Sequence, residues 1–348
     1  MDTNRKELEL YSDKIELVLS QHKLAGRVTG GVVTPRAIQF HIAGATAHAL
    51  QQLAGDLARA LGADDVRVVR VGIATQLEIK RSDAATVKLL PLLARLTGPK
   101  LPDFTAALGL CDDGAPLLLR LPSPDVGHIL VAGEAGRSLL RTIALSLVIT
   151  ERPQRLRFVF VGRTFDDLAT LPHVHAEFRQ HGIGDLAGAL RSLGDLAQRR
   201  RDNVLPRVVI VIDDLARVAG DDTTGSLLRG LLKGGHAAGI HVIAYAQDAA
   251  KLGAWAGDFA TRLVGQVKSP EAATLQARSA AGLLGTGAEK LEPGDFIAIA
   301  GGQVIRFTAA AISSAELRQV VAQMGSRPAR WDLAGRPSLL RAAVARLT

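Results

Sequence analysis

Five short, mostly apolar runs, separated by longer segments with helical periodicity, constrain the fold of this chain most strongly. Runs of four to six such residues are typical of strands that are buried on both faces of a parallel sheet. The segments between them repeat apolar residues every three or four positions, which predicts helices. We therefore expect a doubly wound α/β domain. Its expected strands are residues 128–132, 158–161, 208–212, 241–246 and 263–267, and its expected helices are residues 139–149, 185–198 and 227–238. A last strand pair is expected at 296–299 and 304–307.

The first hundred residues show a different pattern, which predicts a small α+β domain. Two segments have helical spacing, and the second is followed by Gly62, a residue that suits a helix end. The expected helices are residues 5–22 and 46–61, and the expected strands are 27–33, 38–42, 66–71 and 76–80. Proline and glycine in segment 97–102 are typical of a linker. The expected domains are thus residues 1–100 and 101–312, followed by a basic tail, 313–348.

Composition excludes several classes of protein. Of the 348 residues, 47% are hydrophobic and 22% are charged, which is normal for a globular protein and unlike a disordered one. No apolar run reaches the roughly 18 residues of a membrane span. The first residues lack the apolar core of a signal peptide, so we expect a cytoplasmic protein without a membrane partner. The single cysteine, Cys111, excludes an internal disulfide and a thiolate-cluster metal site.

Positive charge is concentrated at the two ends of the sequence. Residues 1–100 hold 14 Lys/Arg against 10 Asp/Glu, residues 101–313 hold 22 against 22, and residues 314–348 hold 6 against 2. Basic ends attract phosphate polyanions such as nucleic acids through counterion release. A solubilising surface explains the same distribution, so both interpretations stay open.

Three strand ends carry residues that suit a nucleotide site. Ligands of open α/β sheets bind beyond the carboxyl ends of the strands. A glycine-bearing turn into a helix, whose backbone N–H groups suit phosphate, consists of Gly133, Glu134, Ala135, Gly136, Arg137 and Ser138. Asp213 and Asp214 follow the strand at 208–212, where carboxylates can hold a hydrated Mg²⁺ and orient a water. Gln247 follows a third strand, where its amide can sense a terminal phosphate.

These motifs, in this order, resemble those of the FtsK/SpoIIIE family of double-stranded DNA translocases, in the FtsK–HerA group of P-loop motors. Segment 236–247, HAAGIHVIAYAQ, is the most specific match and resembles the segment that ends in the family's sensor glutamine. The other similar segments are the lead-in to the phosphate loop at 126–133, the Walker B strand at 209–216, the arginine-bearing strand at 261–263, the late turn at 282–296 and the small-domain helix at 53–62.

The resemblance implies a RecA-like P-loop fold, ATP and Mg²⁺ as ligands, double-stranded DNA as a partner and a homo-oligomeric ring, expected to be a hexamer. It assigns the turn at 133–138 to phosphate binding and Asp213 to the metal ion. It further assigns Asp214 to the attacking water and Gln247 to the sensor position. Arg262 would be the finger that reaches the phosphate of a neighbouring subunit.

The phosphate turn departs from the family pattern, G-x-x-x-x-G-K-[ST]. Counted from Gly133, the places of the second glycine, the lysine and the hydroxyl hold Ser138, Leu139 and Leu140. A loop shortened by at least two residues puts Arg137 in the lysine place, but a planar guanidinium does not simply replace a compact ammonium. We therefore expect weak or absent ATP binding at a degenerate Walker A motif.

The other site residues also have plain structural interpretations. Asp214 stands where the family has glutamate, and a positioning loss of about 1 Å can cost on the order of 100-fold in rate. Carboxylates at 213 and 214 also suit the cap of a helix N-terminus. Gln247 and Arg262 are equally explained as polar residues at strand ends. The catalytic and the structural interpretation of each residue stay open here.

Two further clusters have bland and functional interpretations. His173, His175 and His181 lack supporting cysteines, so exposed loop histidines are expected rather than a metal site. The arginines at 199–201 follow a predicted helix, where they suit its dipole, and a contact with DNA phosphate is the alternative. For His128 we expect a structural hydrogen bond.

The function expected from these observations is that of an FtsK-like, ring-forming DNA-binding protein with poor or absent ATP hydrolysis. One alternative is an active translocase that uses Arg137 in a remodelled loop. Another is a subunit of a secretion or conjugation apparatus with a protein partner. The neutral charge of residues 101–313 favours this last option, because a motor that grips duplex DNA needs positive charge.

Overall fold

The computed structural model describes residues 2–33, 37–64, 66–71, 74–81, 86–96, 101–178, 183–200, 204–267, 288 and 291–324. By its internal contacts the chain divides into two compact units, Met1–Val87 with Leu110–Ala115, and Lys88–Gly109 with Pro116–Thr348. Helix α4 (Leu89–Leu96), which precedes the expected boundary at residue 100, packs against α5 (Gly136–Thr150) in the second unit. The division into domains of residues 1–100, 101–312 and 313–348 stays a prediction.

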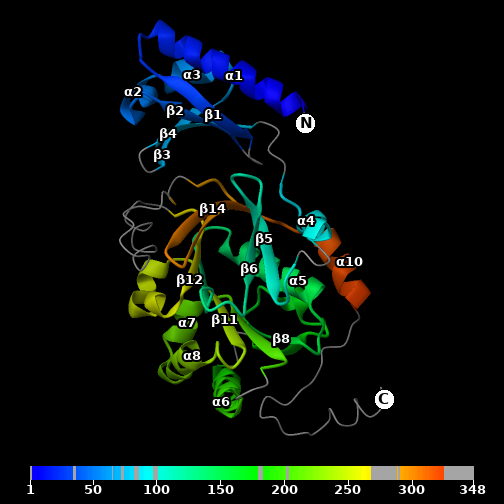
Figure 1. Cartoon of the computed structure of the whole chain (residues 1–348). Coiled ribbons are helices and arrows are strands. Elements are labelled where there is room, and N and C mark those ends of the chain that lie inside the picture. Colours follow the sequence, from blue (N-terminus) through cyan, green and yellow to red (C-terminus); the bar gives the residue numbers. More distant parts are fainter. Residues whose placement is uncertain are drawn as a thin grey trace. The chain divides into compact units, whose positions relative to one another are not determined.

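The first unit contains a four-stranded antiparallel sheet with the strand order β1-β2-β4-β3 (Figure 1). Its elements are α1 (Asp2–Gln21), β1 (Arg27–Val33), β2 (Ala37–Ala43), α2 (Ala47–Gln52), α3 (Ala54–Leu61), β3 (Val66–Val71) and β4 (Ala74–Lys80). The single helix predicted over residues 46–61 is wrong, because Leu53 leaves helical geometry with ψ near 1°. Thr46 caps α2 by accepting the N–H of Ala49, and Gly62 ends α3 in the left-handed conformation, as its position predicted.

The second unit contains a ten-stranded sheet with the order β6-β5-β14-β13-β12-β7-β11-β10-β8-β9. The run from β12 to β9 is parallel, and β13 is antiparallel to both β12 and β14. The strands are β5 (Thr105–Cys111), β6 (Pro116–Arg120), β7 (Ile129–Ala132), β8 (Leu156–Val161), β9 (Val174–Phe178), β10 (Arg207–Ile212), β11 (Ile240–Ala246), β12 (Thr261–Val264), β13 (Asp295–Ala300) and β14 (Gln303–Ala309). The strand predicted at 263–267 instead begins at Thr261, in register with Ile129 of β7.

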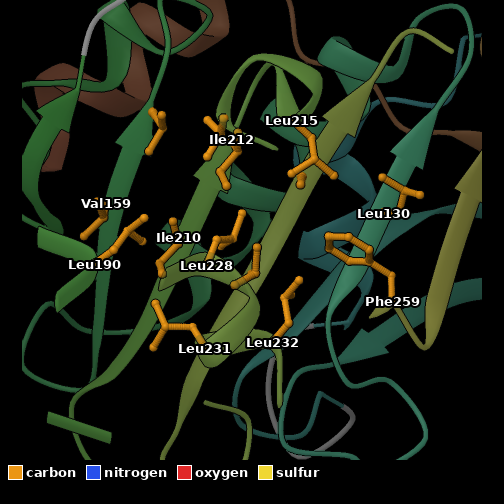
Figure 2. Packing of buried hydrophobic residues seen from close by; sticks show 14 of the residues in the cluster. Leu130, Val159, Leu190, Ile210, Ile212, Leu215, Leu228, Leu231, Leu232 and Phe259 are labelled. Carbon is orange, nitrogen blue, oxygen red and sulfur yellow. The ribbon is translucent and has the colours of Figure 1, made fainter. Parts of the chain in front are cut away.

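Helices cover both faces of this sheet. On one face lie α6 (Ile183–Arg199), α7 (Leu215–Ala219), α8 (Asp222–Gly234) and the 3₁₀ segment η2 (Ala249–Asp258). Their leucines pack on the apolar side chains of β7, β8, β10 and β11, as Figure 2 shows for Leu228, Leu231 and Ile210. Helix α5 packs on the opposite face, on β7 and β11.

Helix α8 begins five residues before the predicted start at residue 227, because Asp221 caps it by accepting the N–H of Thr224. The short η1 (Asp166–Leu168) and α10 (Ser314–Met324) complete the unit.

The predicted exposed histidine loop is wrong where it is described. His173 is buried directly before β9, and its Nε2 lies 2.7 Å from the carbonyl oxygen of Glu151. The side chains of His175 and His181 lie outside the described residues, as do Arg201, the turn at 282–285 and the tail after residue 324. In the described part of the chain, no group of three metal-ligating side chains is close enough to hold an ion.

A polar cluster lies at the amino ends of β7, β10 and β11, where His128 and His241 are buried and the other members are half-buried; we call it the amino edge. It contains His128, Arg200, Arg207, His236 and His241. The Nδ1 of His128 accepts the N–H of Val242 at 3.0 Å, the structural hydrogen bond expected for it. The guanidinium of Arg200 donates to three carbonyl oxygens, those of Val204, Pro206 and Ala238, at 2.8–3.2 Å. These contacts support the structural interpretation of Arg200.

Candidate functional site

The parallel strands end together at the opposite edge of the sheet, which we call the carboxyl edge. The sequence-predicted turn lies here, between the last residue of β7, Ala132, and the first residue of α5, Gly136. Only three residues make the turn, because Gly133 and Ala135 take φ angles of +82° and +58° and reverse the chain tightly. Leu139 and Leu140, in the expected lysine and hydroxyl places, are buried. Glu134, Arg137 and Ser138 are exposed.

The turn is held against the segment that follows β12. The N–H of Glu134 donates to the carbonyl oxygen of Gln266 at 2.9 Å, and the N–H of Gly265 donates to Ala132 at 2.8 Å. A Cβ atom on Gly133 would lie 2.8 Å from two carbonyl oxygens of this segment, so the position requires glycine. At least one backbone N–H that could meet a phosphate is thus already engaged within the chain.

Tyr245, near the end of β11, lies directly beneath the turn. Its side chain is only 3% exposed, and its hydroxyl lies 3.3 Å from the carbonyl oxygen of Gly133 and in hydrogen-bond contact with Oε1 of Gln247. Its single hydroxyl proton serves one of these acceptors at a time. The guanidinium of Arg137 stacks over the ring, 4.9 Å from its centroid. Burial raises the pKa of Tyr245, an effect that the cation of Arg137 opposes, so the phenol stays neutral.

Asp213 follows β10, on the same face of the sheet as α5. Its buried carboxylate accepts two hydrogen bonds from Thr164, from the backbone N–H at 3.0 Å and from the hydroxyl at 2.9 Å. A Cβ atom on Gly162 would lie within 1.7 Å of Oδ1, so only glycine leaves room for the carboxylate. The side chain therefore reaches toward the loop after β8, whereas β7 and its turn lie on the other side of β10.

Asp214 and Gln247 occupy the adjacent strand ends. Asp214 is the N-cap of the five-residue helix α7, and its carboxylate accepts the N–H of Arg217 at 3.3 Å. This contact is the one that the helix-capping interpretation of Asp214 expects. The side chain of Gln247 is exposed and contacts the Tyr245 hydroxyl. The carboxyl edge thus brings together the turn, both aspartates and Gln247.

Arg262 lies away from this group. It is paired with Leu130 in the middle of β7, is only 4% exposed, and its guanidinium donates to the carbonyl oxygen of Ala256 in η2. Burial lowers its pKa. A finger must present its guanidinium at the surface, and the arrangement described here instead holds this one inside the subunit.

The described residues do not fit Mg²⁺-ATP in this arrangement. The ring of Tyr245 fills the space against the first turn of α5, since a Cβ atom on Gly136 would lie 2.4 Å from its Cε2. The N–H of Glu134 is engaged with Gln266, and the expected metal ligand, Asp213, is engaged with Thr164. With the turn shortened to three residues, the place of the P-loop lysine falls on Arg137 in the first turn of α5, and its guanidinium lies over the Tyr245 ring.

Sequence reasoning missed three participants in this site: Tyr245, Thr164 and Gln266. Thr164 and Gln266 belong to no motif, and their roles depend on which strands are neighbours. A signal existed only for Tyr245, a bulky aromatic residue placed two positions before the expected sensor glutamine.

No protein-family model matches the chain. Over 208 residues the chain is 27% identical to the DNA translocase FtsK of Shewanella oneidensis, a match that covers 56% of this chain and 22% of FtsK. The chain therefore spans only about a fifth of the length of that relative.

Two solved structures resemble this chain over most of its length. The cytoplasmic domain of the type VII secretion ATPase EccC of Thermomonospora curvata aligns with a TM-score of 0.60 and 22% identity, covering 73% of this chain and 36% of EccC. The monomer form of the pCW3 conjugation coupling protein TcpA with ATPγS aligns with a TM-score of 0.59 and 15% identity, covering 90% of this chain and 98% of TcpA.

The fold is that of the RecA-like P-loop ATPases. The predicted α/β fold class, with a small additional N-terminal unit, is thereby confirmed. Identities this low establish the RecA-like architecture and leave the chemistry of the site to its own residues. Among the described helices, none combines the length and apolarity needed to cross a bilayer.

Proposed function

We propose that the chain is an FtsK-like subunit that assembles into a ring, binds double-stranded DNA and hydrolyses ATP poorly or not at all. The observation that carries this proposal is the three-residue turn before α5, which is shorter than a P-loop and puts an arginine, Arg137, where the P-loop motif needs lysine. The RecA-like fold supplies the architecture, and the degenerate Walker A turn removes the groups that bind and activate the β- and γ-phosphates. In this proposal the Mg²⁺ and ATP sites are weak or vestigial.

The DNA and ring parts of the proposal rest on different support. The similarity to FtsK, a DNA translocase, favours duplex DNA as the partner. The excess of Lys/Arg in residues 1–100, 14 against 10, supplies positive charge for a polyanion. A homo-oligomeric ring, with a hexamer as the expected form, follows from the family resemblance alone.

A second candidate is a subunit of a secretion or conjugation apparatus that contacts a protein. Its specific support is the balanced charge of residues 101–313, 22 against 22, which gives the larger unit no net attraction for DNA. The structural similarity to EccC, a secretion ATPase, and to TcpA, a conjugation coupling protein, agrees with this candidate.

An ATPase assay of the full chain, with and without duplex DNA, tests the loss of hydrolysis. Enzymes commonly turn over on the order of 1–100 substrate molecules per second. We expect the ATP turnover of this chain to lie far below that range. Turnover in that range that is abolished by both Arg137→Ala and Asp213→Ala would instead establish the active-translocase alternative.

Titration of a labelled duplex at two salt concentrations separates the two candidate partners. DNA binding with a steep loss of affinity at higher salt supports the first candidate, because each neutralised phosphate releases counterions. No binding at low salt rejects it and leaves the protein-partner candidate. Analytical ultracentrifugation of the same samples measures the oligomeric state, and a monomer on DNA would contradict the ring.

A further inference from the structure

Tyr245 joins two segments that a nucleotide would have to separate. Its ring lies against the first turn of α5, where only a glycine, Gly136, leaves room for it. Tyr245 is paired with Val131 of β7. The side chain of Val131 also lies close to Gly136, since its Cγ1 would be 3.2 Å from a Cβ atom placed on that glycine. The end of β7, the start of α5 and the end of β11 are thus packed around one aromatic side chain.

The hydroxyl extends this packing to polar contacts. It reaches the carbonyl oxygen of Gly133, the first residue of the turn, and the amide of Gln247, the first residue after β11. A buried hydroxyl without a partner is destabilising, so these contacts favour the turn conformation that supplies them. The side-chain oxygen of Gln247, the expected phosphate sensor, is thus engaged with Tyr245.

Arg137 is bound by the same side chain. Its guanidinium lies over the Tyr245 ring, 4.9 Å from the centroid, where a cation is attracted to the face of the ring. Arg137 is the residue that the remodelled-loop alternative assigns to the phosphates. In the observed arrangement its cation faces the ring.

We propose that Tyr245 is an intramolecular plug that keeps the β7–α5 turn closed and excludes the phosphates of a nucleotide from the N-terminus of α5. This inference rests on the proposed function, in which the site is inactive, and adds the device that holds it inactive. A closed site that opens only rarely lowers the apparent affinity in proportion to its open fraction. Removal of the ring therefore raises nucleotide affinity, an effect that an ordinary core residue at this position does not produce.

The direct test compares Tyr245→Ala with a matched control in the full chain. Ile243→Ala removes a fully buried side chain from the same face of the same strand, in register with Ile129 at the far end of β7. Both variants lose core packing, but only Tyr245→Ala opens the turn. With Mg²⁺-ATP in calorimetric titrations, we expect about tenfold or more tighter binding by Tyr245→Ala than by the wild type, and no gain for Ile243→Ala. Equal affinity of folded Tyr245→Ala and wild type overturns the plug, as does an equal gain in both variants.

A gentler variant keeps the test decisive if Tyr245→Ala does not fold. Tyr245→Phe retains the ring and removes only the hydroxyl contacts to Gly133 and Gln247. We expect amide hydrogen exchange in residues 133–138 to become several-fold faster, with unchanged exchange at the amino end of β11. Unchanged exchange in the turn overturns the plug. These results are distinct from a failure of the proposed function. Rapid ATP turnover by the wild type would reject the proposed function, whether or not the Tyr245 variants change nucleotide binding or hydrogen exchange.

Discussion

The two edges of the parallel sheet are both closed by polar contacts, but with different exposure. At the amino edge, His128 and His241 are buried, and the Nη1 of Arg207 lies 3.1 Å from Nε2 of His241. At the carboxyl edge, the turn, Asp213 and Tyr245 are held by contacts within the chain, while Arg137 and Gln247 remain exposed beside them. The same strands therefore end in a sealed cluster on one side and in a closed but accessible site on the other.

This difference separates stability from ligand binding. We expect substitutions at the amino edge to change the free energy of unfolding, because the contacts described for its side chains lie within the fold. Substitutions at the carboxyl edge change both the stability and the accessibility of the candidate site.

The largest effect is expected from Arg200→Ala at the amino edge. The substitution leaves the carbonyl oxygens of Val204, Pro206 and Ala238 without their charged donor. We expect the free energy of unfolding in urea to fall by about 2–3 kcal/mol. The control is Arg199→Ala, one residue earlier and exposed, whose contact with the carbonyl oxygen of Asp195 is local and for which a change below about 0.5 kcal/mol is expected. Equal effects would show that Arg200 is as dispensable as a surface residue.

A fall in pH should lower the free energy of unfolding through the histidines of the amino edge. Burial, with a smaller contribution from His236, lowers the pKa of His128 from its ordinary 6.5 to about 4. Between these values the unfolded chain binds a proton that the folded chain does not, so stability is present above pH 6.5 and is lost as the pH falls toward 4. Between pH 7 and pH 5 this loss is about 2 kcal/mol for His128. Burial lowers the pKa of His241 in the same direction.

Urea titrations at pH 7 and pH 5 measure this loss. His128→Asn keeps an acceptor for the N–H of Val242 and removes the titrating group, so its stability should depend less steeply on pH than that of the wild type. A slope that is unchanged in His128→Asn would assign the acid sensitivity to other groups.

The sequence predicted the buried interior better than either edge. The strands that were recognised are runs such as 208–212, in which burial on both faces leaves an unbroken apolar signal. The edges depend on pairs that are distant in sequence, such as Asp213 with Thr164 and Glu134 with Gln266. Neither partner of these pairs can be found by spacing, because the strand order sets which loops meet. For the same reason, the sequence shows that residues 138–140 differ from the G-K-[ST] of the phosphate motif, but not that the ring of Tyr245 packs against Gly136.

At the carboxyl edge, Gly136→Ala should be destabilising although alanine favours helices. The new Cβ atom would lie 2.4 Å from the Tyr245 ring, so the ring or the helix must move. We expect a loss of about 1–2 kcal/mol in thermal or urea unfolding, in line with other overpacked sites. In α8, a Cβ atom on Gly230 would meet no described atom within 4 Å, and Gly230→Ala should instead stabilise by about 0.5–1 kcal/mol. Combining Gly136→Ala with Tyr245→Leu should recover part of the loss, and an additive loss in the double variant would locate the strain elsewhere.

The smallest effect is expected at Asp213, where two interpretations predict opposite signs. If the carboxylate stabilises the fold through Thr164, Asp213→Ala leaves the half-buried N–H and hydroxyl of Thr164 without their acceptor and lowers the free energy of unfolding. The relief from burying a charge offsets part of this loss, so we expect a net cost of about 1 kcal/mol. A carboxylate kept only for a metal ion would, in contrast, be an uncompensated buried charge in the metal-free chain, and its removal would stabilise. A double-mutant cycle with Thr164→Val decides between them, because a structural pair should show a coupling energy of about 0.5–1 kcal/mol in metal-free buffer.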